Sequence, residues 1–326
     1  MANATRGYGS FGSKSAFAAY LIVCVVWGST YLAIRIGVAV MPPFLFAGLR
    51  FVTAGALLLA GALAFGDGLP RRAQDWRTLA VVGTLLLAGG NSLVVWAEQY
   101  TPSGVASVFV VTVALWMSFF DAVVPGGRSR LTGRILIGLA VGLVGTSLLV
   151  GLSPTDLAHA DLRGPVALTI ASACWSLGSI YAKRHPTTTS PYVSAAVEML
   201  CGGTVAIVLG TVQGEWHAWA PSTRGFEAMA YLVVFGSIVG YSAYGYALRH
   251  ASPTVVGTYA YVNPIIAVLL GRIVLGEPVT STIVVAMALI LGAVVWIHAA
   301  VRGGTMTATR DAVQQADRAG TTNRGP

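Results

Sequence analysis

Two charged side chains of opposite sign lie within apolar stretches at matching places in the chain. Arg50 lies in the stretch FAGLRFVTAG, inside an apolar run from Pro43 to Phe65. Glu198 lies in a similar run in the second half, among small residues. A charge at the centre of a bilayer costs about 2.5–3.5 kcal/mol, so both side chains should face protein or water rather than lipid.

Two interpretations of these charges stay open. In the first, Arg50 binds a carboxylate or polar group of a substrate, and Glu198 takes part in proton coupling or in closing an inner gate. In the second, Arg50 pairs with Glu98 at the end of a neighbouring apolar run, while Glu198 pairs with Lys183. The two are compatible, because an ion pair that breaks during a transport cycle acts as a gate.

Polar and aromatic residues recur at helical spacing along several apolar runs, which predicts a water-filled cavity between helices. Trp and Tyr near helix ends are typical of the membrane interface, but the deeper Trp27, Trp175, Tyr244 and Tyr259 favour the cavity. The candidate substrate-binding residues are Trp27, Tyr31, Arg50, Asn91, Glu98, Trp175, Ser179, Glu198, Tyr244, Tyr259 and Asn263.

Pro264 lies in the interior of another apolar run. Proline has no N–H to donate, so the carbonyl of Ala260 loses its helical partner and the helix should kink there. The kink is interpreted either as a hinge that moves during function or as a static bend packed by its neighbours.

The residue groups of an integral membrane enzyme are absent from the sequence. Its five histidines fall in predicted loops or at helix ends, without HExxH spacing, and no P-loop pattern occurs. Cys24, Cys174 and Cys201 lie inside apolar runs, where a thiol usually packs as a small apolar group. We therefore expect no enzyme activity, no catalytic residue, no metal, no cofactor and no disulfide.

Composition places these residues in a membrane protein. Of the 326 residues, 55% are hydrophobic and only 10% charged, whereas soluble proteins carry roughly 25% charged residues. Each apolar run holds about 20 residues, enough to cross a hydrocarbon core of about 30 Å. The ten predicted helices cover 17–37, 43–65, 77–98, 103–124, 133–152, 164–183, 191–212, 226–248, 253–275 and 280–300.

The net charge of +8 follows from membrane topology rather than from a nucleic-acid site. With both termini in the cytoplasm, fifteen of the 20 Lys and Arg residues fall on the cytoplasmic side, as the positive-inside rule requires. Arg outnumbers Lys 18 to 2, which we interpret as a sign of a GC-rich bacterial genome. The predicted location is the bacterial cytoplasmic membrane, with lipid as the surrounding partner.

The two halves of the chain resemble each other. Trp27 and Pro43 recur as Trp175 and Pro191, so the offset is 148, and the same offset aligns Arg50 with Glu198. Each half contains five helices, an odd number, so the second enters the membrane from the opposite side. Inverted repeats of this kind build alternating-access transporters. The predicted all-α fold consists of repeats 17–152 and 164–300, between disordered cytoplasmic ends 1–16 and 301–326.

Several segments together resemble the EamA family of the drug/metabolite transporter superfamily, in its YedA-like branch. They are WGSTYLAIRIGV, PPFLFAGLRF, GNSLVVWAEQYTPSGVAS and SPTVVGTYAYVNPIIAVLLGRIVLGEP. The resemblance covers roughly residues 17 to 300 and implies ten helices, a central cavity, peripheral fifth and tenth helices, and export of small metabolites. In place of Asn263-Pro264 the first repeat has Val113-Ala114, so the hinge pattern occurs only in the second.

The sequence thus predicts a secondary transporter, an exporter of small polar or amphipathic metabolites with possible proton coupling. An exporter of lipophilic cations is the alternative, because aromatic walls and Glu198 would suit a cation. A non-transporting membrane sensor or enzyme is the alternative from another class. The GxxxG spacing of Gly138 and Gly142 indicates close helix packing or a homodimer contact.

Overall fold

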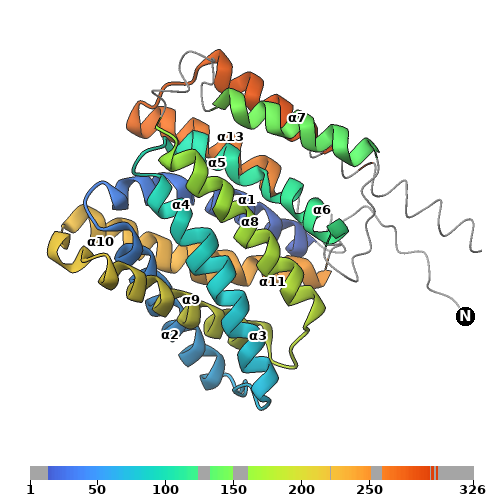
Figure 1. The fold of residues 1–326 in the computed structure, drawn as a ribbon. Coiled ribbons are helices and arrows are strands. Elements are labelled where there is room, and N and C mark those ends of the chain that lie inside the picture. The colour runs from blue at the N-terminus through green and yellow to red at the C-terminus, as the bar shows by residue number, and fades with distance from the viewer. Residues whose placement is uncertain are drawn as a thin grey trace, which may run out of the picture.

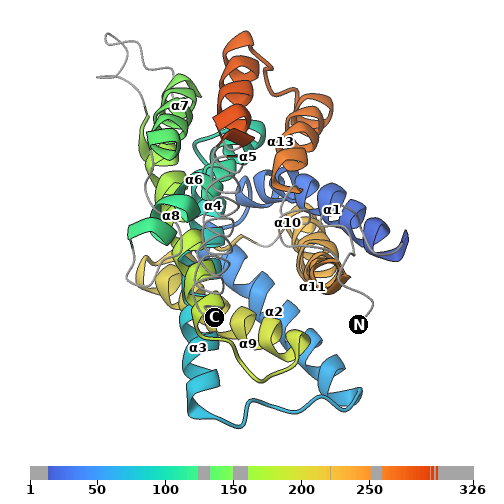
Figure 2. The same cartoon turned by 90° about the vertical axis from the view of Figure 1, so that its right-hand side faces the viewer.

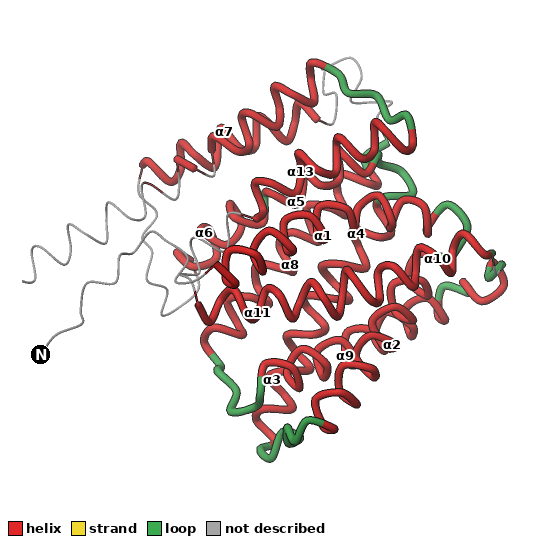
Figure 3. The backbone as a smooth tube through the Cα atoms, turned by 180° about the vertical axis from the view of Figure 1, so that it is seen from behind, coloured by secondary structure: helices red, strands yellow, loops and turns green. Residues whose placement is uncertain are grey.

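The computed structural model of the protein describes residues 14–123, 133–149, 161–220, 222–250 and 259–293, together with 295, 296 and 299. Throughout this part of the chain the regular structure is helical (Figure 3). The first helix already begins at Lys14, inside the segment expected to be disordered. Residues 1–13 and the predicted C-terminal tail lie outside the described residues.

The first half forms five consecutive helical segments, two of which are divided. Its third segment contains a π-helix, η1, between two α-helices, and its fourth breaks at Thr112. The elements are α1 (Lys14–Val38), α2 (Pro43–Ala64), α3 (Ala73–Gly83), η1 (Thr84–Asn91), α4 (Ser92–Ala97), α5 (Ser103–Val111), α6 (Val113–Val123) and α7 (Gly133–Leu149).

The second half repeats this plan, so the described residues confirm the predicted ten-helix, all-α fold. Six segments are long and apolar enough to cross a membrane as they stand, and the others are shorter or interrupted. The elements are α8 (Arg163–Arg184), α9 (Pro191–Val212), the short η2 (Glu215–Ala218), α10 (Thr223–Tyr231), η3 (Leu232–Val239), α11 (Gly240–His250), α13 (Tyr259–Leu270), η4 (Gly271–Leu275) and an apolar helix Ser281–Ala293.

The second helices of the two repeats, α2 and α9, lie side by side (Figures 1 and 2). Gly48 packs against Ile207, and further along α2 Gly55 packs against Met199. The two helices are therefore antiparallel, as inverted repeats require. Glycine at the contact lets the backbones approach closely, as in other membrane helix pairs.

An acidic residue from each repeat meets the start of the second helix of the other repeat. Glu215 accepts bonds from the backbone N–H groups of Phe44 (3.2 Å) and Leu45 (2.8 Å) at the start of α2. Asp67, at the equivalent position by the offset of 148, accepts a bond of 2.7 Å from the hydroxyl of Ser190, which caps α9. Burial raises the pKa of Glu215, and the two N–H bonds act against this shift. These bonds fasten both ends of the α2–α9 pair.

Replacing Glu215 by Ala should lower the stability of the purified protein by about 1–2 kcal/mol, because two N–H groups at the start of α2 lose their acceptor. Glu227→Ala is the matched control, since Glu227 is exposed on α10. Thermal unfolding of both variants measures the difference. Equal unfolding temperatures for the two would show that the cross-repeat cap does not stabilise the fold.

The fifth and tenth helices pack together at one edge of the molecule, as the family resemblance implied (green and orange-red at the top of Figure 1). Gly145 of α7 lies against Ile290, while Gly142 lies against Leu115 of α6. The glycine-rich face of α7 is thus used for packing within the chain. A homodimer contact stays a prediction.

Candidate functional site

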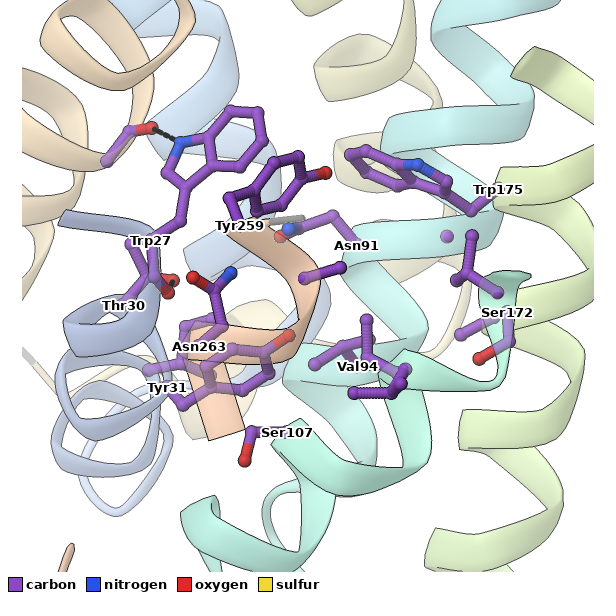
Figure 4. Close-up of a pocket in the computed structure, with 18 of the residues that line it drawn as sticks. Trp27, Thr30, Tyr31, Asn91, Val94, Ser107, Ser172, Trp175, Tyr259 and Asn263 are labelled. Carbon is purple, nitrogen blue, oxygen red and sulfur yellow. Dashed lines mark hydrogen bonds between the residues drawn. The ribbon is translucent and has the colours of Figure 1, made fainter. Parts of the chain in front are cut away.

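A cavity lies at the centre of the helix bundle, lined by elements of both repeats (Figure 4). Trp27, Tyr259 and Trp175 surround it at one level, and Val94 and Ser107 lie below them in the view of Figure 4. The predicted residues that line it are Trp27, Tyr31, Arg50, Asn91, Trp175, Tyr259 and Asn263.

Arg50 is the charged group in the wall of this cavity. Its side chain is only 3% exposed, and its guanidinium donates to the Ser237 hydroxyl (Nε to Oγ, 3.2 Å) and to the Asn91 amide oxygen (Nη1 to Oδ1, 3.4 Å). The guanidinium carbon also lies 4.7 Å from the centre of the Phe51 ring. Within the described residues the one side-chain salt bridge joins Arg163 to Asp161, so Arg50 takes part in none there. Arg50 is therefore a buried cation with neutral hydrogen-bond partners.

The expected Arg50–Glu98 pair is not formed. Both carboxyl oxygens of Glu98 are buried without a hydrogen-bond partner, and Arg35 donates to its backbone carbonyl instead. Similarly, no salt bridge between Glu198 and Lys183 occurs in the described part of the chain. Both pairs were predicted from position along the helices, which does not fix the angle of a side chain around the helix axis.

The partners of Arg50 lie on two π-helical segments related by the internal repeat. η1 covers Thr84–Asn91 and η3 covers Leu232–Val239, which is again an offset of 148. A π-helix turn places one extra residue in the helix and is common at functional sites. Here η1 carries Asn91 and η3 carries Ser237, and Arg50 bonds to both, so it links one segment of each repeat.

An aromatic cluster forms another part of the cavity wall that contains Arg50. The Trp27 ring centre lies 5.4 Å from that of Tyr241, 5.2 Å from that of Tyr244 and 4.9 Å from that of Tyr259. Its indole N–H donates to the carbonyl of Gly236 (3.1 Å), at the same π segment that carries Ser237 (dashed line in Figure 4). Contacts of this kind fix the orientations of the rings, and Trp27, Tyr241 and Tyr259 contribute them to the cavity wall.

Four predicted site residues lie outside the cavity wall: Glu98, Ser179, Glu198 and Tyr244. Ser179 donates to the Trp175 carbonyl of its own helix (2.8 Å), and the Tyr244 ring contacts Trp27. Glu198 lies where α9 crosses α3 at Gly83. Conversely, Tyr241 lines the cavity and Ser237 bonds to Arg50, although neither was among the candidate binding residues. The signal was their helical spacing with Tyr244, which predicted a polar face on that helix.

Pro264 lies inside α13, directly after the cavity residue Asn263. With its amide oriented to satisfy its surroundings, Asn263 donates to the carbonyls of Cys24 (3.2 Å) and Tyr259 (3.1 Å). Helix α13 is therefore linked to α1 beside the proline. Pro264 cannot donate a hydrogen bond to the Ala260 carbonyl, and the Asn263 side chain ties this part of α13 to α1. Both features are compatible with a hinge at Pro264, which stays a prediction.

If Pro264 is a hinge, Pro264→Ala should stabilise the protein to heat, because a helix-interior proline costs about 3 kcal/mol, and should slow transport several-fold. Substrate affinity should change little, since the proline ring itself is not needed for binding. The measurement is the initial transport rate and the unfolding temperature of the same preparation. An unchanged rate in a stabilised variant would identify the kink as static.

Comparison with known proteins agrees with this architecture. Residues 14–151 and again 162–299 match the EamA-like transporter family. The chain is 39% identical over 282 residues to the uncharacterized inner membrane transporter YedA of Escherichia coli K12, covering 86% of this chain and 90% of the relative. It is also 26% identical over 279 residues to the probable amino-acid metabolite efflux pump of Salmonella typhimurium, covering 82% and 89%.

A solved crystal structure shares the fold. Its TM-score to this chain is 0.62 at 24% sequence identity, and the match covers 90% of this chain and 99% of that one. The overall fold thus occurs in a structure determined by experiment.

Proposed function

Because the chain belongs to the EamA-like transporter family, a family of membrane transporters and not of enzymes, we propose that it exports small metabolites that carry a carboxylate. Amino acids are the first class to test. The substrate would bind in the central cavity, and the two repeats would rock to open the cavity to each side in turn. Direction and substrate are the parts of this proposal that go beyond family membership.

Arg50 carries the proposal. A buried cation with neutral partners is costly unless an anion joins it. A guanidinium group has five N–H donors, and the bonds to Asn91 and Ser237 use two of them. The remaining donors suit a carboxylate, which arginine can bind with two parallel hydrogen bonds. The Trp27 cluster would pack against the apolar part of the same molecule.

The alternative substrate, a lipophilic cation, has less support. The aromatic rings of Trp27, Trp175 and Tyr259 could bind a cation by cation–π contact. However, Arg50 would repel it, and the carboxylate that was expected to attract it, Glu198, does not line the cavity. A sensor without transport is disfavoured because both repeats contribute residues to one enclosed cavity.

Location and orientation belong to the proposal as well. The relative YedA is described as an inner membrane transporter, and we infer the same cytoplasmic membrane of a bacterium for this multi-pass protein. The excess of Lys and Arg in alternate connections supports cytoplasmic termini. Coupling to protons would supply the energy for export.

The proposal is tested by thermal stability of the purified protein against amino acids, organic anions, nucleosides and lipophilic cations. A ligand that binds only the folded state adds about 2.7 kcal/mol at 100 times its dissociation constant. Stabilisation by carboxylates, absent for their uncharged analogues, is the expected result. Stabilisation by cations alone would favour the drug-type alternative.

A further inference from the structure

Glu98 lies in the layer that separates the central cavity from an outer groove. Tyr31, on the cavity wall, interacts electrostatically with Glu98. On the other side, Arg35 lines the groove and donates to the carbonyl of Glu98. Glu98 itself lines neither space and is 0% exposed. By the predicted topology this groove faces the outside of the cell.

The carboxyl group of Glu98 has no hydrogen-bond partner. Both of its oxygens are buried, and neither accepts or donates a bond within the described chain. An ionised carboxylate in that position would lose its hydration without gaining a hydrogen bond, which is costly in free energy. The positive charge of Arg35 offsets this only at a distance, because its hydrogen bond goes to the Glu98 backbone carbonyl. The uncharged acid is the form that such a site can hold.

The second charged neighbour also favours the uncharged acid. Glu277, in the loop after η4, interacts electrostatically with Glu98. Its carboxylate is fully engaged at the start of α5, where it accepts bonds from the Ser103 N–H (2.9 Å), the Ser103 hydroxyl (2.8 Å) and the Gly104 N–H (3.2 Å). These three bonds hold the Glu277 carboxyl in place near Glu98. Two nearby carboxyl groups resist being ionised together.

We propose that Glu98 is the proton-binding site of this transporter, an inference that rests on the proposed transport function. Glu98 takes up a proton when the layer is open to the outer groove and keeps it while the layer is closed, as in this structure. It releases the proton toward the cytoplasm once the cavity opens inward, so protons move inward as substrate moves outward. The titratable or charged groups around Glu98 are Tyr31, Arg35 and Glu277. When the layer closes, the uncharged Glu98 side chain becomes buried among these three groups. Closing the outer side is thus coupled to protonation of one named residue.

Infrared spectroscopy of the purified protein tests the protonation directly and needs no substrate. A protonated carboxylic acid has its own carbonyl-stretching band, distinct from that of a carboxylate. The wild type at pH 7 should show a band that Glu98→Gln lacks and that the matched variant Glu198→Gln retains. Identical carboxylic-acid bands in the wild type and Glu98→Gln would overturn the proposal.

Transport in everted membrane vesicles tests the coupling, with radiolabelled L-amino acids as the probe. Wild-type uptake should rise when the vesicle interior is acidified, whereas Glu98→Gln should transport at the same residual rate with and without the pH gradient. Stimulation preserved in Glu98→Gln, or lost only in Glu198→Gln, would overturn the proposal. If the wild type moves none of these amino acids, the substrate assignment fails, and the infrared comparison alone decides the role of Glu98.

Discussion

Replacing Arg50 by Ala is expected to remove binding and export of carboxylate substrates. Truncating one partner of a buried, hydrogen-bonded charge pair costs about 2–5 kcal/mol. This corresponds to a dissociation constant roughly 30-fold to several thousand-fold weaker. Titration of the purified variant with the most stabilising carboxylate measures the loss, and a transport assay should give no uptake above background.

Two further variants separate charge from geometry. Arg50→Lys keeps the positive charge but cannot reach Asn91, Ser237 and both oxygens of a carboxylate with a planar fork, so binding should be intermediate. Ser237→Ala removes one bond that orients Arg50 and should weaken binding less than Arg50→Ala does. Wild-type affinity in a folded Arg50→Ala protein would mean that Arg50 only connects the two π segments.

A second large effect is expected at the crossing of α3 and α9, where Gly83→Val should prevent stable folding. A side chain at Gly83 would overlap the backbone of Glu198, and a side chain at Gly202 on the facing helix would overlap the Gly83 carbonyl just as closely. Because backbone meets backbone, no side-chain rotation relieves the clash. Overpacking costs typically about 1–3 kcal/mol and occasionally more, and overlap of a side chain with the facing backbone places this position in the more costly group.

The matched control is Gly61, a glycine in the interior of α2 with nothing near its missing side chain. Gly61→Ala should be neutral or stabilising, because alanine favours a helix by about 1 kcal/mol over glycine. Yield of monodisperse protein and unfolding temperature compare the variants, with Gly83→Ala as the milder change. A Gly83→Val protein as stable as the wild type would show that α3 and α9 are separated more widely than described.

The helices and the repeat could be predicted because both depend on patterns that run along the chain. Apolar runs of about 20 residues identify membrane helices regardless of what packs against them. The offset of 148 linked Arg50 to Glu198, and it also holds for features the sequence did not suggest, the segments η1 and η3. A π-helix depends on how one turn packs between neighbours, so composition alone carries little sign of it.

Side-chain directions were harder to predict than positions. Height in the membrane follows from residue number, which made Arg50–Glu98 a reasonable pair. The angle around each helix axis depends on tertiary packing, and the Glu98 carboxyl interacts electrostatically with Arg35 and Tyr31 instead. Ser179 shows the same limit, because its hydroxyl bonds to its own helix at Trp175. Arg50, Asn91 and the aromatic residues of the wall were predicted because charge and ring size leave few other places for them.

The measurement that tests the central claim most directly is a thermodynamic cycle of binding free energies, with one change made in the substrate and one in the protein. Binding of one amino acid and of its carboxamide analogue is titrated for the wild type and for Arg50→Ala. If Arg50 holds the carboxylate, the amide binds far more weakly to the wild type, while Arg50→Ala binds acid and amide alike, so the two losses are not additive. Additive losses, with Arg50→Ala still preferring the acid, would place the carboxylate elsewhere and contradict this account.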